Sequence, residues 1–242
     1  MADMREIYVL NKKVRLLQPA EGFRTSMDSV MLAAACPIKE GETFLDMGCG
    51  VGGAGFCVLW RVAGTQLTGV ELQDSHVALA EENIGLNKME GRAEFVCDDI
   101  RRYQSAAPFN HVICNPPYLE AGHHSPSPRP EKAVAMGHEE EALSVSDWID
   151  AGFRNLKSKG SLTMIHRADA ADRMIRAMGK RFGDIEIIPL WPKAGAPAKR
   201  MIIRARKDRK GGAILHPGVI LHEKNGKDTK EADLVLREGR AL

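Results

Sequence analysis

Short apolar runs alternate along the chain with longer segments in which apolar residues recur at helical spacing. Regular strand–helix alternation favours a mostly parallel sheet with helices on both faces, and so an α/β fold. The predicted strands lie near residues 43–47, 67–71, 93–97, 109–114 and 160–166. The predicted helices lie near residues 26–36, 53–62, 75–87, 144–158 and 169–182.

The last part of the chain breaks this alternation. Residues 184–190 and 200–206 have strand character, and no helical pattern separates them, so we expect them to pair antiparallel. Two later runs, 213–216 and 219–222, predict an appended hairpin before a polar stretch. We expect one domain of 242 residues, divided into an N-terminal segment with a helix (1–40), a core (41–206) and a C-terminal appendage (207–242).

Composition agrees with a globular domain and excludes several classes of protein. The net charge is only +2, so any surface that binds nucleic acid must be local; residues 193–210, rich in lysine and arginine, are the candidate. A solvated edge strand would have a similar composition. The five cysteines show no Cys-x-x-Cys spacing, and His123-His124 lies in a Pro-rich segment, so we expect no disulfide framework and no metal. No apolar stretch is long enough to span a membrane, and we expect a cytoplasmic protein.

The sequence Asn115-Pro116-Pro117-Tyr118 directly follows the predicted strand at 109–114. Prolines lack an N–H and cannot continue a strand, so the chain must turn at the edge where open α/β sheets bind ligands. The Asn115 side-chain oxygen and the Pro116 carbonyl are acceptors, and Tyr118 adds a flat aromatic face. Such a pocket suits an exocyclic amine on a planar ring, although a plain strand-ending turn is the alternative.

Glycines and carboxylates mark the neighbouring strand ends. Residues 46–53, Asp-Met-Gly-Cys-Gly-Val-Gly-Gly, let the backbone turn tightly in front of a helix N-terminus. Glu71 follows by about 20 residues, the interval at which an acid meets ribose hydroxyls in nucleotide-binding sheets. Asp98 and Asp99 end the next strand and can accept from an adenine amino group. From these residues alone a dinucleotide site remains possible, because Gly53 completes a Gly50-x-x-Gly53 spacing.

With these motifs the chain resembles the class I S-adenosylmethionine-dependent methyltransferases. Asn-Pro-Pro-Tyr resembles the signature of the branch that methylates adenine N6, cytosine N4 or glutamine amides. More narrowly, the chain is similar to the bacterial tRNA adenine-N6 methyltransferases that modify the adenosine beside the anticodon of a valine tRNA. That similarity covers about residues 14–206 and includes residues 25–33, the basic strand at 199–203 and the lack of a long N-terminal domain. It implies a Rossmann-like seven-stranded sheet, mostly parallel, with an antiparallel strand at one end.

The resemblance also implies S-adenosylmethionine as cofactor, tRNA as substrate and a set of site residues. The expected cofactor-binding residues come from the glycine loop, the strand ends and the segment before the first strand: Asp28, Asp46, Gly48, Gly50, Gly52, Glu71, Leu72, Asp98, Asp99 and Asn115. The expected catalytic residues form the turn: Asn115, Pro116, Pro117 and Tyr118. The expected RNA-binding residues come from the basic strand: Lys199, Arg200, Arg204 and Arg206.

In this interpretation Asn115 and Pro116 hold the two amino N–H groups, and Tyr118 stacks on a base that has left its own stack. If Tyr118 instead packs the turn, its loss would lower stability rather than kcat. Asp46 would steady the loop or simply cap the next helix.

Two departures from the family concern the substrate. The chain has Ser26-Met27-Asp28 where the family often has Gly-Thr-Asp, so only Asp28 carries over. The segment 119–137 is unusually long, and we expect it to cover the substrate. We expect a monomer. The alternatives are glutamine methylation of a release factor, whose enzymes usually have an extra N-terminal helical domain, and a non-catalytic RNA-binding module. A small-molecule methyltransferase is a third, disfavoured by the basic stretch.

Overall fold

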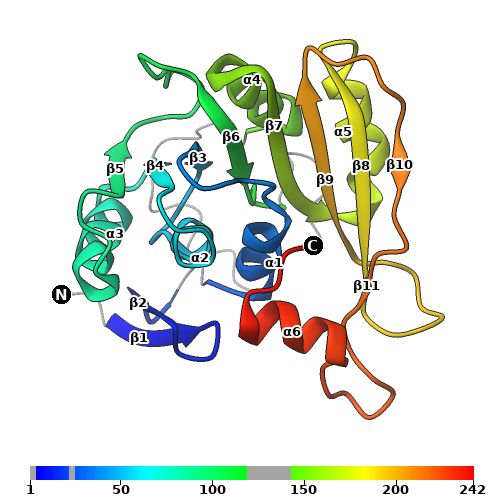
Figure 1. Ribbon diagram of the computed structural model, residues 1–242, viewed down its shortest axis with the longest axis horizontal. Helices are drawn as coiled ribbons and strands as arrows, with labels where there is room; N and C mark the ends of the chain where they lie inside the picture. The colour runs from blue at the N-terminus through cyan, green and yellow to red at the C-terminus, as the bar shows by residue number, and fades with distance from the viewer. Residues whose placement is uncertain (1–3, 22–24, 119–142) are drawn as a thin grey trace, which may run out of the picture.

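The computed structural model describes residues 4–21, 25–118 and 143–242, and one mixed sheet lies at its centre (Figure 1). Seven strands form the body of the sheet in the order β5-β4-β3-β6-β7-β9-β8, and β9 runs antiparallel to both its neighbours. The predicted fold class, including its antiparallel strand, is confirmed. The seven strands are β3 (Thr43–Met47), β4 (Gln66–Glu71), β5 (Ala93–Cys97), β6 (Phe109–Cys114), β7 (Leu156–Arg167), β8 (Phe182–Trp191) and β9 (Arg200–Lys207).

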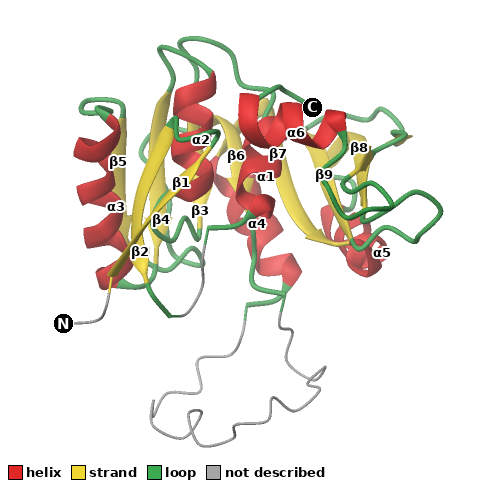
Figure 2. Cartoon of the chain, turned by 90° about the horizontal axis from the view of Figure 1, so that it is seen from below, coloured by secondary structure: helices red, strands yellow, loops and turns green. Residues whose placement is uncertain are grey.

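Helices cover both faces of this sheet (Figure 2). The side chains alternate along each strand, so Phe44 packs with α1, α2, α3 and α6, whereas Leu45 and Met47 pack with α4 and α5. The helices are α1 (Met27–Ala35), α2 (Gly53–Arg61), α3 (Asp74–Asn87), α4 (Val145–Asn155), α5 (Ala171–Met178) and α6 (Lys230–Glu238), with a 3-10 turn η2 (Ala168–Ala170) before α5. The helix predicted at 144–158 ends earlier, because β7 already begins at Leu156.

The C-terminal appendage differs from the prediction. The short strands β10 (Ile214–Leu215) and β11 (Val219–Ile220) do not form a hairpin; each pairs parallel with β8 instead. The edge of β8 that faces away from β9 offers unpaired backbone groups to both strands, and apolar patterning cannot distinguish this partner from a local one. The predicted hairpin is therefore wrong, and the polar stretch after it contains α6, which packs on α1.

An N-terminal hairpin, β1 (Met4–Val9) and β2 (Val14–Pro19), also went unpredicted. Two asparagines of α3 hold it in place. The Asn83 amide exchanges hydrogen bonds with the backbone N–H and carbonyl of Leu17 at 2.7 and 3.1 Å, and the Asn87 amide does the same with Arg15. Because residues 15 and 17 lie on one edge of β2, the two side-chain amides take the place of a neighbouring strand.

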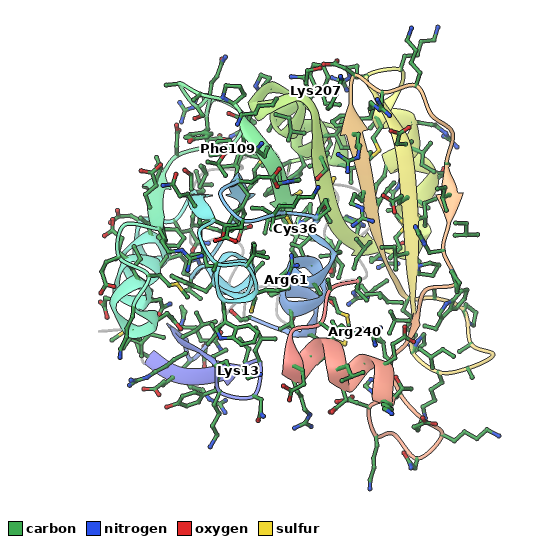
Figure 3. All side chains as sticks on the ribbon, in the orientation of Figure 1. Lys13, Cys36, Arg61, Phe109, Lys207 and Arg240 are labelled. Carbon is green, nitrogen blue, oxygen red and sulfur yellow. The ribbon has the colours of Figure 1, made fainter. Side chains whose placement is uncertain are left out.

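A polar contact joins α2 to the C-terminal end of α1. Arg61 of α2 donates to the carbonyls of Ala33 and Cys36 at the C-terminal end of α1 (Figure 3). A guanidinium there satisfies carbonyls that the helix leaves without partners. Within the described ranges, no helix is both long and apolar enough to cross a membrane.

The parallel strands end together at one edge of the sheet. Met47 of β3 lies in register with Val70 and with Cys114, and Cys114 with Met164 of β7. The residues that follow these strands therefore meet at this edge. Arg200, the first residue of the antiparallel β9, pairs with Arg167 at the same edge.

Candidate cofactor and substrate site

A cavity of about 280 Å³ lies at this edge of the sheet. Its size suits a small organic ligand. It brings together most of the predicted cofactor residues with the turn after β6. The predicted residues in its wall are Gly48, Gly50, Glu71, Leu72, Asp98, Asp99, Asn115 and Pro117.

The glycine loop forms one wall of the cavity. Gly48 and Gly50 both have positive φ, +64° and +56°, which a side chain rarely adopts. Gly50 lines the cavity and a Cβ there would meet no atom within 4 Å, whereas a Cβ on Gly48 would strike the Trp148 ring at 2.6 Å. Gly52 lies outside the cavity wall and is the N-cap of α2, where a Cβ would strike Phe56. Its expected role in cofactor binding remains a prediction.

Glu71 is held beside Gly50 at the end of β4. One carboxylate oxygen accepts from the Gly50 N–H at 2.9 Å and the other from the Gln73 N–H at 3.0 Å. The side chain is buried apart from the part that lines the cavity, so these bonds fix its direction. Each oxygen keeps a lone pair that can accept a ligand hydroxyl.

Asp46 supports the loop from beneath the cavity. Its carboxylate is buried and accepts from the Gly55 N–H at 3.0 Å, which caps the first turn of α2. Burial raises the pKa of Asp46 to about 7, and the nearby Glu71 charge adds to this. This contact is the helix cap that the sequence analysis gave as the alternative for Asp46, which is not in the cavity wall, and its role toward the cofactor stays a prediction.

Asp98 and Asp99 lie on the far side of the cavity. Asp98 accepts from the Asp99 N–H at 2.7 Å, and Asp99 pairs with Arg101. The hydrogen bond from Arg101 keeps the pKa of Asp99 below its usual range, so this carboxylate is an acceptor at neutral pH. Val70, Leu72 and Ile100 add apolar surface between Glu71 and these acids.

The turn after β6 brings Asn115 into the cavity and sends Tyr118 towards α1. The Tyr118 hydroxyl lies 2.7 Å from an Asp28 carboxylate oxygen and 3.1 Å from the Asn115 side-chain oxygen. A phenol can donate only one hydrogen bond, and the closer, charged carboxylate of Asp28 accepts it. The Asn115 oxygen therefore keeps its lone pairs for another donor. Pro116 is buried, and Pro117 lines the cavity.

Comparisons with known proteins agree with this geometry. The methyltransferase small domain family matches residues 25–128. A tRNA1(Val) (adenine(37)-N6)-methyltransferase of Shewanella sp. strain MR-7 is 32% identical over 60% of this chain and 61% of its own length. A protein of the same name from Tolumonas auensis is 25% identical over 94% of this chain and 87% of its own. The chain thus spans about three fifths of the first of these relatives.

Solved structures show the same fold. A predicted O-methyltransferase from Agrobacterium tumefaciens superposes with a TM-score of 0.73 at 26% identity, over 89% of this chain and 97% of that one. A tRNA (m1A58) methyltransferase from Aquifex aeolicus superposes with a TM-score of 0.55 at 13% identity, over 80% and 73%. Together, the family match, the relatives and these structures support a class I S-adenosylmethionine-dependent methyltransferase.

The cavity of this methyltransferase fits the family's cofactor. The open space over Gly50 admits a ligand close to the backbone, and Glu71 offers acceptors for a ribose diol. The apolar strip between Glu71 and Asp98 suits a flat adenine ring with its amino group at the acid end. Donor and acceptor chemistry therefore agrees with S-adenosylmethionine, whose binding would involve Gly48, Gly50, Glu71 and the acids after β5.

Sequence patterns missed several cavity residues of this methyltransferase. The largest is Trp148 of α4, which is 5% exposed and packs against Gly48. His76 of α3 also lines the cavity, with its Nδ1 4.0 Å from Glu71. Nothing in the sequence distinguishes either residue from an ordinary helix residue, because helix orientation decides which side reaches the cavity. His123, His124 and the segment 119–137 lie outside the described residues.

The four basic residues expected to bind RNA do not share one surface. Lys199 is exposed, and Arg200 is half-buried and lies over the Tyr118 ring. Arg204 pairs with Glu186 through two nitrogens and donates to the Ala35 carbonyl, so its guanidinium is used within the protein. Arg206 lies at the opposite end of β9 and donates to the Lys159 carbonyl. Of these four residues, only Lys199 keeps an exposed charge at the edge where the turn lies, and only Lys199 enters the RNA-binding proposal.

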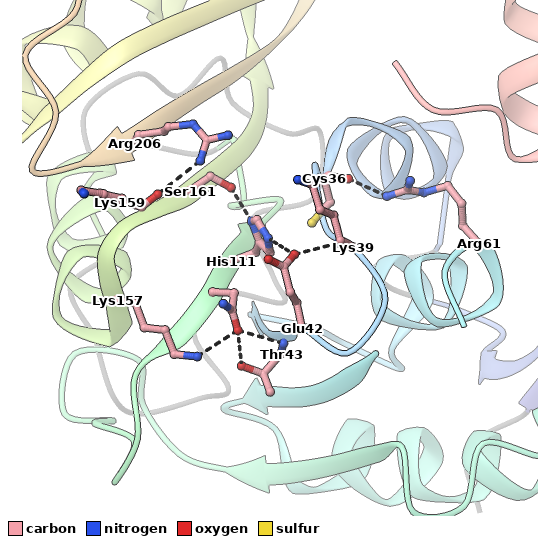
Figure 4. A network of polar contacts seen from close by, with 11 residues as sticks. Cys36, Lys39, Glu42, Thr43, Arg61, His111, Lys157, Lys159, Ser161 and Arg206 are labelled. Carbon is pink, nitrogen blue, oxygen red and sulfur yellow. Dashed lines mark hydrogen bonds and ion pairs between the residues drawn. The ribbon is translucent and has the colours of Figure 1, made fainter. Parts of the chain in front are cut away.

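A second polar network contains a serine, a histidine and a carboxylate in a row (Figure 4). His111 contacts the Ser161 hydroxyl at 2.7 Å through one ring nitrogen and Glu42 at 2.9 Å through the other. The order matches a nucleophile, base and acid. Ser161 is fully buried between strands, however, so no substrate can reach it, and the network fixes the strands instead.

Proposed function

We propose that this methyltransferase transfers the methyl group of S-adenosylmethionine to the exocyclic N6 of an adenosine in tRNA. The tRNA1(Val) adenosine beside the anticodon is the target we favour, since relatives at 25–33% identity carry that name. A tRNA substrate implies a cytoplasmic enzyme. The monomeric state expected from the sequence stays a prediction.

The observation that carries the proposal is the acceptor left on Asn115. Adenine N6 is a weak nucleophile because its lone pair is delocalised into the ring. The Asn115 oxygen, with the Pro116 carbonyl as the second expected acceptor, would hold the amino hydrogens and turn the lone pair towards the cavity. The cofactor, when bound, would supply an electrophilic methyl group and leave as S-adenosylhomocysteine, and the methylated amine would then release one proton. Orientation of the amine in line with that group gives most of the acceleration in this proposal.

Basic side chains at the same edge favour RNA over a release factor. Lys193 and Lys199 are exposed in the loop between β8 and β9, and this loop ends at Arg200, which lies over the Tyr118 ring of the turn. A glutamine amide could use the same acceptor on Asn115, so the turn by itself does not select the substrate. The basic edge does, because phosphates dominate the affinity of proteins for nucleic acids.

The test is transfer of labelled methyl from S-adenosylmethionine to tRNA that lacks its own modifications, followed by nucleoside analysis. We expect label in N6-methyladenosine and a loss of about 10²–10³-fold in kcat with Asn115→Ala. Asn225→Ala, in an exposed turn, is the matched control and should keep full activity. Cofactor binding without label in any RNA would refute the proposal, and label in release factors would then identify the alternative.

A further inference from the structure

Tyr118 lies between two charged side chains from distant parts of the chain. Asp28 comes from the first turn of α1, and Arg200 from the first position of β9. Asp28 accepts from the Tyr118 hydroxyl at 2.7 Å, and the same carboxylate oxygen accepts from Arg200 Nε at 3.1 Å. The Arg200 guanidinium lies over the Tyr118 ring, 4.7 Å from its centre.

Neither charged residue lies where its expected role would place it. Asp28 is buried and is not in the wall of the cofactor cavity. Arg200 is two-thirds buried and uses its Nε and its flat face within the protein. A buried charge is costly unless it is paired, so the position of Asp28 and Arg200 around Tyr118 calls for an explanation at this site.

The arrangement decides which acceptor receives the single hydrogen bond that the Tyr118 hydroxyl can donate. Burial raises the pKa of Tyr118 well above its usual range, and the Asp28 hydrogen bond adds to this, so the hydroxyl stays protonated. Without the Asp28 carboxylate, the other acceptor within reach of the Tyr118 hydroxyl would be the Asn115 side-chain oxygen, at 3.1 Å. The Tyr118 hydroxyl would then donate to the oxygen that the substrate amine needs as its hydrogen-bond acceptor.

We infer that Asp28 is a positioning residue that keeps the Tyr118 proton away from Asn115, and that Arg200 holds Asp28 and the Tyr118 ring in this arrangement. The inference rests on the proposed function, because it assigns a benefit to amine binding at Asn115. It replaces a cofactor role for Asp28 and a phosphate role for Arg200.

A pair of substitutions tests the role of Asp28. In Asp28→Ala the Tyr118 hydroxyl turns to Asn115, and the amine must displace it, so kcat should fall about tenfold, the equivalent of one hydrogen bond. KM for tRNA and Kd for the cofactor should stay near wild type. Adding Tyr118→Phe removes the competing hydroxyl and should restore most of kcat. If the alanine variant fails to fold, Asp28→Asn should show the same direction of change.

Arg200 is tested by a substitution that keeps its charge. Arg200→Lys loses the Nε donor and the flat face, so kcat should fall while KM for tRNA and its salt dependence stay unchanged. Arg237→Lys, an exposed residue of α6, is the matched control and should behave as wild type. An arginine that only contacts phosphate would give the opposite pattern, with kcat intact and, for Arg200→Ala, a salt slope reduced by about one.

Two results would overturn the inference: a weaker cofactor Kd with normal kcat in Asp28→Ala, or a double variant no faster than the single one. If the wild type methylates no RNA, the proposed function fails on its own. NMR of ring-labelled tyrosine then decides the inference separately, because the chain has three tyrosines and Tyr118→Phe assigns the signal. A Tyr118 signal that moves in Asp28→Ala supports the contact, and one that does not move refutes it.

Discussion

The substitution Gly50→Ala tests whether the cavity at the end of β3 and β4 binds the cofactor. Gly50 has φ +56°, and a Cβ at this position would meet no protein atom within 4 Å. The added methyl group would therefore clash with nothing in the protein, and we expect it to take up ligand space because Gly50 lines the cavity. Gly41 has φ +78° and is equally free of neighbours, but it lies in an exposed turn away from the site.

These two glycines separate backbone strain from loss of cofactor space. Placing alanine in the left-handed region costs about 1–2 kcal/mol, which lowers Tm by roughly 2–8 °C in a chain of this size. Both variants should show this loss. In Gly50→Ala the methyl group also occupies ligand space, and overpacking of about 1–3 kcal/mol would weaken cofactor binding roughly 5- to 150-fold.

The assay is calorimetric titration with S-adenosylmethionine or S-adenosylhomocysteine, alongside thermal unfolding of both variants. We expect weaker binding in Gly50→Ala and wild-type binding in Gly41→Ala, with similar losses of Tm. Wild-type affinity in Gly50→Ala would show that the ligand does not approach this backbone. Equal weakening in both variants would show that general strain, rather than the cavity, controls binding.

Three further outcomes follow from contacts outside the cavity. Asn83→Ala removes the hydrogen-bond partner of backbone groups in β2 and in the loop before α2. This substitution should lower the free energy of unfolding in urea by about 2–4 kcal/mol, more than Asn87→Ala at a more exposed position. Burial lowers the pKa of His111 below its unfolded value, so stability is full above about pH 6.5 and falls as the pH drops through it. His111→Gln should flatten that part of the stability profile. Arg204→Ala should cost about 1–3 kcal/mol of stability through its lost carboxylate pair while leaving KM for tRNA unchanged.

Much of the central sheet could be predicted because its inner strands, such as β3 and β6, are buried on both faces and give apolar runs. Residues 43–47, 93–97 and 109–114 were predicted with the bounds that the structure has. The two ends of the chain could not be predicted in the same way. β1 and β2 depend on the Asn83 and Asn87 amides far along the sequence, and β10 and β11 depend on an edge of β8.

The sequence predicted the site residues that lie at strand ends, but not those that helices bring to the cavity. Gly50, Glu71 and Asn115 follow strands whose carboxyl ends share one edge, so topology alone brings them together. Trp148 enters from α4, and the direction of a helix relative to the sheet is set by packing that no local pattern reports. Asp28 was expected to bind the cofactor; its carboxylate contacts Tyr118 and lies outside the cavity wall, a contact between residues 90 positions apart that no local pattern reports.

The direction of β9 limits where an RNA substrate can lie. Its six steps from Arg200 to Arg206 cover about 20 Å, and the strand leads away from the cavity edge. Only the beginning of β9 can contact a nucleotide whose base reaches Asn115, even though the sequence shows one continuous basic stretch. The preceding loop, with Lys193 and Lys199 exposed, lies at that same edge. We therefore expect the RNA backbone to cross the loop between β8 and β9 and not to follow β9. Charge reversal at Lys199 should then weaken tRNA binding more than charge reversal at Arg206.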